Sequence, residues 1–159
     1  MNAPNPGFHL RGFTLVELIM VLALAGILAA VVGPRLFATS TFDARGFHDE
    51  TLALLRYAHK SAIAQRRPVC VVFGGNTASL GIDADRNGAT GTSGCEAGLT
   101  GPRGETPGTI TARGTVQYAA TPATVVFDGL GQPAAGQTIQ VSGAAQTITI
   151  EATTGYVHD

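Results

Sequence analysis

One carboxylate lies inside a long apolar run near the start of the chain. Glu17 is the only charged residue among the 21 residues from Phe13 to Gly33. A carboxylate in such a segment costs about 2.5–3.5 kcal/mol on insertion into a membrane, so it needs a partner. A cut between Gly12 and Phe13 would create an α-amino group one helical turn from Glu17. An amine on this chain or on a neighbouring one could then neutralise the carboxylate.

A second group of candidate ligands lies in an acidic turn. Asp83, Asp85 and Asn87 place oxygen atoms at the first, third and fifth positions of a segment with glycine at the sixth, as in a calcium loop. The twelfth position is Gly94 instead of a bidentate glutamate. Aspartate, asparagine and glycine also form turns without an ion. We therefore favour a turn and keep calcium as the weaker alternative.

The remaining polar residues do not form a catalytic pattern. The four histidines, at positions 9, 48, 59 and 158, are scattered along the chain. Neither a Gly-x-Ser-x-Gly sequence nor a phosphate-binding loop occurs. We predict that the protein is not an enzyme and needs no cofactor. His48 and His59 have the spacing of residues on the inner face of a helix, which favours core or interface positions.

The charges argue against a general nucleic-acid binder. The formal net charge is −1, whereas such binders present a basic surface. Residues 35–67 hold six basic and three acidic residues, and the chain from residue 68 onward holds three basic and seven acidic ones. This asymmetry is better suited to packing among like subunits than to binding a polyanion.

One long helix is expected to come first in the chain, with its first half in the membrane and its second half packed on the head. The apolar part of residues 13–34, as a helix, would span about 30 Å, the thickness of the hydrocarbon core of a bilayer. Residues 35–67 show the three- and four-residue rhythm of an amphipathic helix, which Pro68 ends. Pro34 would bend or loosen the helix between the two halves.

The rest of the chain, residues 68–159, predicts a β-rich head. Apolar and polar residues alternate in short runs, separated by glycine-rich turns. The expected strands are residues 69–73, 78–82, 115–119, 124–127, 138–141, 147–152 and 156–157, and residues 83–108 are expected to form a long surface loop. One helix followed only by strands predicts an α+β fold in which the helix lies on an antiparallel sheet.

The N-terminal motif resembles that of a known family. Gly12 and the following Phe-Thr-Leu-Val-Glu, residues 13–17, are similar to the processing site of type IV pilins and type II secretion pseudopilins. Pro34 matches a proline common in the long helix of this family. Residues 127–129 and 154–157 resemble the GspH/FimT branch of minor pilins and pseudopilins. Residues 42–72 and the chain's ending are also similar to minor pilins of mannose-sensitive haemagglutinin type pili.

The resemblance implies a defined maturation. Residues 1–12 would be a leader that prepilin peptidase removes by cleavage between Gly12 and Phe13, followed by N-methylation of Phe13. Glu17 would direct the registration of subunits in the filament. Arg11, before the apolar run, would keep the leader in the cytoplasm. The protein would thus be a single-pass inner-membrane protein with a periplasmic head, and later part of a filament.

This location bears on the two cysteines. Cys70 and Cys95 are the only cysteines in the chain, and disulfides persist outside the cytoplasm. A closed loop of about 25 residues would contribute on the order of 3 kcal/mol to stability. We expect a disulfide; the alternative is a core Cys70 and a free thiol at Cys95.

The predicted function is that of a minor pilin-like subunit which assembles with other pilin or pseudopilin subunits into a type IV pilus. The main alternative is a minor pseudopilin of a type II secretion system. A DNA-binding minor pilin is disfavoured because no lysine or arginine follows Arg113. A membrane-anchored binding module that keeps its first 12 residues is a further alternative.

Overall fold

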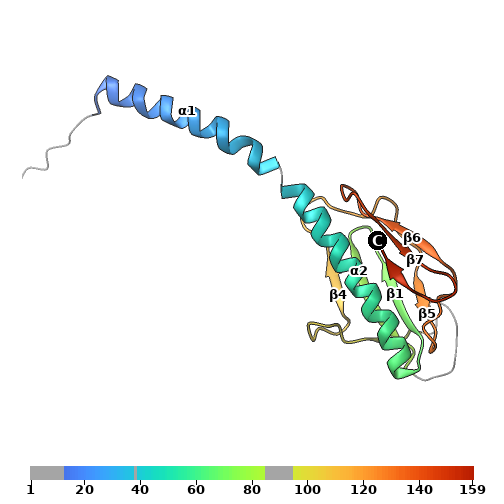
Figure 1. The fold of residues 1–159 in the computed structure, drawn as a ribbon. Coiled ribbons are helices and arrows are strands. Elements are labelled where there is room, and N and C mark those ends of the chain that lie inside the picture. Colours follow the sequence, from blue (N-terminus) through green and yellow to red (C-terminus); the bar gives the residue numbers. More distant parts are fainter. Residues whose placement is uncertain (1–12, 38, 85–94) are drawn as a thin grey trace, which may run out of the picture. The chain divides into compact units, whose positions relative to one another are not determined.

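The computed structural model describes residues 13–37, 39–84 and 95–159, with residues 29–37 and 39 described by their backbone alone (Figure 1). The chain divides into two compact units, of which the first ends at Ala38 and the second begins at Thr39. We call the second unit the head.

The first unit contains the helix α1 (Leu15–Phe37). Leucine, methionine and alanine, which favour helices, fill about half of it. The helix continues past Pro34 to Phe37, so the proline does not end it. Over the part of the chain that the structure describes, none of the helices combines the length and the apolarity that a membrane crossing requires.

The helix α2 (Thr39–Gln65) opens the head. Its buried side chains recur mainly every three or four residues, and they are Ala44, Phe47, His48, Thr51, Leu52, Leu54, Leu55, Ala58, Ser61 and Ala62. At its end, Arg66 adopts a left-handed backbone with φ of 51°. The amides of Arg66 and Arg67 donate to the carbonyls of Ile63 (3.3 Å) and Ala62 (3.2 Å), which is a Schellman motif. The predicted amphipathic helix is confirmed from Thr39 to Gln65, whereas residues 35–37 of the predicted segment belong to α1.

A five-stranded antiparallel sheet follows, in the order β3-β2-β1-β5 with β4 also paired to β2. Its strands are β1 (Val69–Phe73), β2 (Thr77–Ile82), β3 (Ala97–Gly98), β4 (Thr109–Thr111) and β5 (Val125–Phe127). β1 and β2 form the predicted hairpin, with Val69 opposite Ile82 and Phe73 opposite Ala78. Val69, Val71 and Phe73 lie in the hydrophobic core that α2 shares with the sheet.

The C-terminal strands form a second antiparallel sheet, in the order β6-β7-β8. They are β6 (Gln137–Gln140), β7 (Thr147–Ile150) and β8 (Val157–His158). Ile139, Ile148 and Ile150 are buried, and the threonines that alternate with them are more exposed. Figure 1 shows α2 crossing in front of the strands of the head. The predicted α+β fold, with a helix on antiparallel sheet, is confirmed.

Two strand predictions are wrong in detail. Residues 115–119 do not form a strand, because the segment makes only one isolated bridge, between Tyr118 and Val141. The short strands β3 and β4 lie within or just beyond the segment predicted as loop. Both are flanked by glycine and proline, which masks the alternation that marks longer strands.

Candidate assembly site and the surface of the head

Glu17 lies in the first turn of α1. The backbone N–H of Glu17 donates to Oγ1 of Thr14 (3.3 Å), and the N–H of Leu18 donates to the Thr14 carbonyl (3.1 Å). Thr14 is therefore the N-cap, and Glu17 is the third helical residue, the spacing of a capping box. A carboxylate here also interacts favourably with the helix dipole. The Thr-x-x-Glu spacing of residues 14–17 is the signal in the sequence that predicts this cap.

The side chains of α1 are exposed on every side wherever the structure describes them. All residues from 13 to 28 are exposed, including Glu17. Phe13, which precedes the helix, is 77% exposed. Large apolar side chains point in all directions, among them Leu15, Ile19, Leu22, Leu24, Ile27 and Leu28. A helix that is apolar all round requires an apolar environment from outside its own fold.

The predicted cleavage bond lies at the edge of this segment. Gly12 is outside the described residues, and Phe13 directly precedes the capped turn. Cleavage between these two residues, N-methylation of Phe13 and a registration role for Glu17 therefore stay predictions.

The two cysteines form the expected disulfide. Cys70, fully buried in β1, is bonded to Cys95, which lies just before β3, with their Cα atoms 6.1 Å apart. Gly81 of β2 makes room for the bridge, because a Cβ there would lie 3.0 Å from Cβ of Cys95. The prediction is confirmed, and the bridge fastens the segment that enters β3 to the centre of the sheet.

The calcium candidates are only partly described. Asp83 follows β2, is fully buried, and its N–H donates to the Pro68 carbonyl (3.0 Å). Asp85 and Asn87 lie outside the described residues. No cluster of three or more histidine, cysteine, aspartate or glutamate side chains that could hold a metal occurs among the residues described. Calcium binding at this turn stays an untested alternative.

Two of the histidines, His48 and His59, pack against other parts of the head. His48 is buried, with Nδ1 3.1 Å from a carboxylate oxygen of Asp49. His59 packs edge-on against the ring of Phe127, with ring centroids 5.4 Å apart. Their contacts agree with the predicted core or interface positions.

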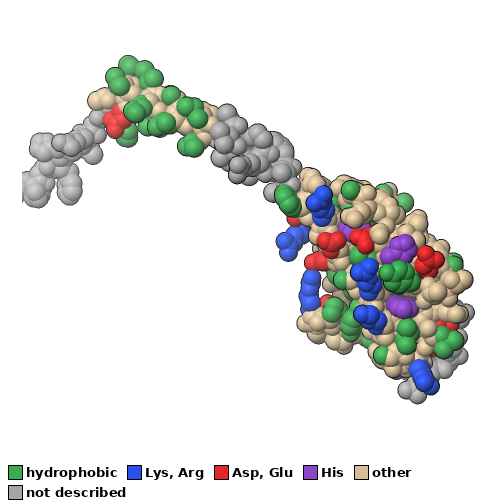
Figure 2. Space-filling model, in the orientation of Figure 1, with side chains coloured by type: hydrophobic (Ala, Val, Ile, Leu, Met, Phe, Trp, Pro, Cys, Tyr) green, Lys and Arg blue, Asp and Glu red, His purple; other side chains and the backbone are tan. Residues whose placement is uncertain are grey.

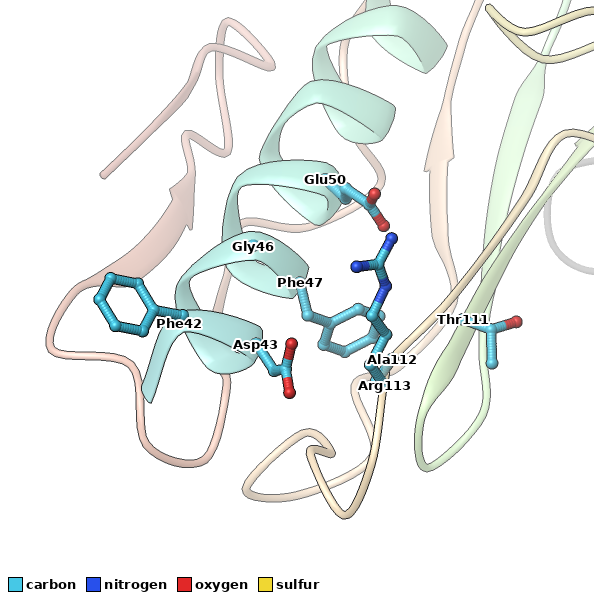
Figure 3. A pocket seen from close by; sticks show the side chains of 8 residues that line it. All are labelled: Phe42, Asp43, Gly46, Phe47, Glu50, Thr111, Ala112 and Arg113. Atoms are coloured by element: carbon cyan, nitrogen blue, oxygen red, sulfur yellow. The ribbon is translucent and has the colours of Figure 1, made fainter. Parts of the chain in front are cut away.

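A shallow open hollow of about 280 Å³ lies beside the first turns of α2. In Figure 3 the ring of Phe47 lies beside the side chain of Arg113, whereas Phe42 points away from both. Arg113 extends toward Glu50, and Glu50 also accepts a hydrogen bond from Arg103 (2.8 Å). This hydrogen bond and the charge of Glu50 raise the pKa of Arg103. The full lining is Phe42, Asp43, Gly46, Phe47, Glu50, Thr111, Ala112 and Arg113.

The hollow offers charged and aromatic side chains. Of its two carboxylates, that of Glu50 pairs with Arg103, and neither serine nor cysteine is among the residues that line it. Such a surface suits contact with another polypeptide better than a reaction on a small molecule.

Comparison with protein families matches residues 49–154 to the type II transport protein GspH. The chain belongs to the GspH family. Residues 9–33 match the prokaryotic N-terminal methylation motif, which covers the Gly12–Phe13 bond, Glu17 and most of α1. The predicted resemblance to the GspH/FimT branch is thereby confirmed, and the chain is a pilin-like or pseudopilin-like subunit.

The fold of this family member is similar to that of a solved minor pilin. A crystal structure of the type IV minor pilin FimU from Pseudomonas aeruginosa aligns with a TM-score of 0.52 and 16% identity, over 77% of this chain and 90% of that one. A second crystal form of FimU aligns with a TM-score of 0.49 and 16% identity, over 72% and 90% of the two chains. No curated protein sequence matches this chain significantly.

Proposed function

We propose that this GspH-family protein is a minor pilin-like subunit of a type IV pilus that primes or decorates the filament. One observation carries the proposal: the methylation motif over residues 9–33 and the GspH head over residues 49–154 occur in one chain. Prepilin peptidase would cut between Gly12 and Phe13, and Phe13 would be methylated. The protein would first lie in the inner membrane, with its head in the periplasm.

The geometry of α1 supports assembly through this helix. Cleavage would place a new ammonium group at the N-terminus of α1, where the helix dipole is already positive. The exposed carboxylate of Glu17, in the first turn, is available to an ammonium group on an adjacent subunit. Such a pair would neutralise the carboxylate within the membrane or the filament and set the axial register. The apolar sides of α1 would then pack against lipid and later against neighbouring helices.

A minor pseudopilin of a type II secretion system is the second candidate. The observation that favours it is the family match itself, whose description is type II transport. Both machines would use the same processing and the same Glu17 contact. The phenotype on deletion distinguishes the two machines. Loss of a surface filament would indicate a pilus, whereas a defect in exoprotein secretion would indicate a type II secretion system. DNA binding and a simple anchored module remain lesser alternatives.

The test separates the charge of Glu17 from its place in the cap. Glu17→Ala removes both, whereas Glu17→Gln keeps an amide that can cap the helix but carries no charge. We expect both variants to be cleaved and methylated at Phe13 but to be depleted from sheared filaments. Mass spectrometry of the N-terminal peptide in membranes and in sheared filaments measures this.

Three results would count against parts of the proposal. Normal incorporation of Glu17→Gln would remove the registration role and leave only the cap. Wild-type protein processed but confined to membranes would favour the secretion pseudopilin. An intact Met1 terminus in the wild type would end the pilin-like function and leave the anchored module.

A further inference from the structure

A rigid turn after β5 holds a leucine out from the head. The carboxylate of Asp128 accepts hydrogen bonds from the amides of Leu130 (2.9 Å) and Gln132 (2.8 Å). The Asp128 amide donates to the Gln132 carbonyl (2.9 Å), which closes the turn. At its tip Leu130 is 78% exposed. This turn is fixed by its own hydrogen bonds, so Leu130 is presented in one place.

A second turn, just before β8, does the same with an aromatic residue. The Gly155 amide donates to the Glu151 carbonyl (3.0 Å), and the Glu151 amide donates to the Tyr156 carbonyl (3.0 Å). Tyr156 is 60% exposed and stacks on His158, with ring centroids 5.3 Å apart. Tyr156 is therefore also held in a defined position on the surface.

Two glycines allow both turns to pack closely on the last part of α2. A Cβ on Gly131 would lie 2.7 Å from both Nε2 of His59 and Cδ1 of Ile63. A Cβ on Gly155 would overlap the Gly131 carbonyl oxygen and approach His59 to 3.0 Å. Both glycines have positive φ, 86° and 68°. The two turns thus touch each other and α2, and Ile63, Leu130 and Tyr156 surround the seam. We call these three residues the α2-end patch.

Cations border the α2-end patch. Arg56 and Lys60 are exposed on α2, two turns and one turn before Ile63, and Arg56 fastens β8 by donating from Nε to the Val157 carbonyl (3.0 Å). In the part of the chain that the structure describes, neither cation pairs with a carboxylate, and the nearby Glu151 lies 3.3 Å from His158. Figure 2 shows lysine and arginine side chains along α2 beside the histidines of the head.

We propose that the α2-end patch binds the head of a different subunit of the same filament, through an apolar surface bordered by carboxylates. This inference rests on the proposed function. Charge excludes a symmetric pair, because two copies meeting through the same patch would bring Arg56 and Lys60 of each against those of the other. The patch therefore meets a different surface, in the kind of contact that extends an assembly instead of closing a dimer. The proposed function is that of a minor subunit, so its neighbours in the filament are other subunits. The exposed leucine and tyrosine are the anchors.

The test uses the full chain in cells that assemble the filament. A photoreactive amino acid replaces Leu130, and in a control chain it replaces Val72, which is 42% exposed on β1. Illumination should link the Leu130 chain, and not the Val72 chain, to another subunit with a processed, methylated N-terminus. Mass spectrometry of the linked product identifies the partner, and the same sample reports whether Phe13 is processed.

Variants test the anchors and the charge separately. Tyr156→Ser should lower the crosslink yield at Leu130 on the order of tenfold, since it removes a large apolar contact. Lys60→Glu should also lower the yield, whereas Lys60→Arg should keep it. Equal yields for Lys60→Glu and Lys60→Arg would overturn the charge complementarity.

The remaining outcomes are also decisive. Equal linking at Leu130 and Val72 would overturn the patch as a specific surface. A covalent pair of two copies of this chain would overturn the choice of a different subunit. A chain that is processed at Phe13 but not linked would overturn this inference alone. A chain that keeps its Met1 terminus would overturn the proposed function and, with it, this inference.

Discussion

The two units of the chain place their apolar side chains in opposite environments. In α1 every described side chain, from residue 15 to residue 28, is exposed, although most are apolar. In the head, the apolar residues of α2 and of both sheets form one buried cluster. The head therefore carries the interactions that define its own fold, whereas α1 depends on what surrounds it. The apolar side chains of the head pack against one another within the chain, whereas those of α1 are available to pack against other molecules.

The same truncation in the two units gives the sharpest contrast. Leu55 is fully buried in the head, and Leu22 is 63% exposed in α1. Leu55→Ala should lower the free energy of unfolding of the head by about 2–5 kcal/mol. Leu22→Ala should change it by less than about 0.5 kcal/mol and act on assembly instead.

Tyrosine fluorescence measures this difference directly. The chain has three tyrosines and no tryptophan, and Tyr57, Tyr118 and Tyr156 all lie in the head. Denaturant unfolding of the detergent-solubilised full chain, followed at the tyrosines, thus reports on the head alone. A loss of head stability in Leu22→Ala equal to that in Leu55→Ala would contradict the separation of the two units.

The disulfide is a second feature that only the head has. Replacing both cysteines, in Cys70→Ala/Cys95→Ala, should lower the free energy of unfolding of the head by about 3 kcal/mol, because a loop of 25 residues is no longer closed. A reductant should destabilise the wild type by a similar amount and leave the double variant unchanged. A double variant as stable as the oxidised wild type would show that the bridge contributes nothing to the head.

The parts that sequence reasoning predicts best are those with a local signal. The rhythm of apolar residues and Pro68 predicted α2, and the β-branched run at residues 69–73 predicted β1 to the residue. The cysteines predicted the disulfide because the motif indicated an oxidising compartment. The motif around Gly12 and Glu17 predicted the family.

The parts that it missed depend on contacts between distant segments. Tyr118 belongs to a run with strand-like alternation, yet this run does not form a strand. Tyr118 makes one isolated bridge, to Val141. The α2-end patch could not be predicted, since it forms where Gly131 and Gly155 both pack on His59. Each glycine alone looks like an ordinary turn residue. Only the three-dimensional packing shows that the exposed Leu130 and Tyr156 lie around one seam.

The variant with the smallest expected effect changes a buried phenol in the head. The sequence of α1 contains no tyrosine, so α1 offers no such test. The hydroxyl of Tyr118 is hydrogen-bonded to Oγ1 of Thr51 (3.0 Å), and Oγ1 of Thr51 donates to the Phe47 carbonyl (2.7 Å). Burial raises the pKa of Tyr118 to about 12, and the hydrogen bond with Thr51 partly opposes this rise. Tyr118→Phe should cost about 1 kcal/mol at neutral pH, because one buried hydrogen bond is lost.

The pH dependence of this variant gives the decisive comparison. In the unfolded chain a tyrosine loses its proton near pH 10, whereas the folded Tyr118 keeps its proton to about pH 12. Between these values the unfolded state binds fewer protons, so the wild-type stability falls as the pH rises, by up to about 2 kcal/mol. Tyr118→Phe should lack this part of the fall, and Tyr156→Phe, which changes an exposed ring, should keep it. Unfolding curves measured from about pH 8 to about pH 11 test both variants. Equal slopes for wild type and Tyr118→Phe would mean that the phenol is solvated, and that this part of the core is more open than its contacts imply.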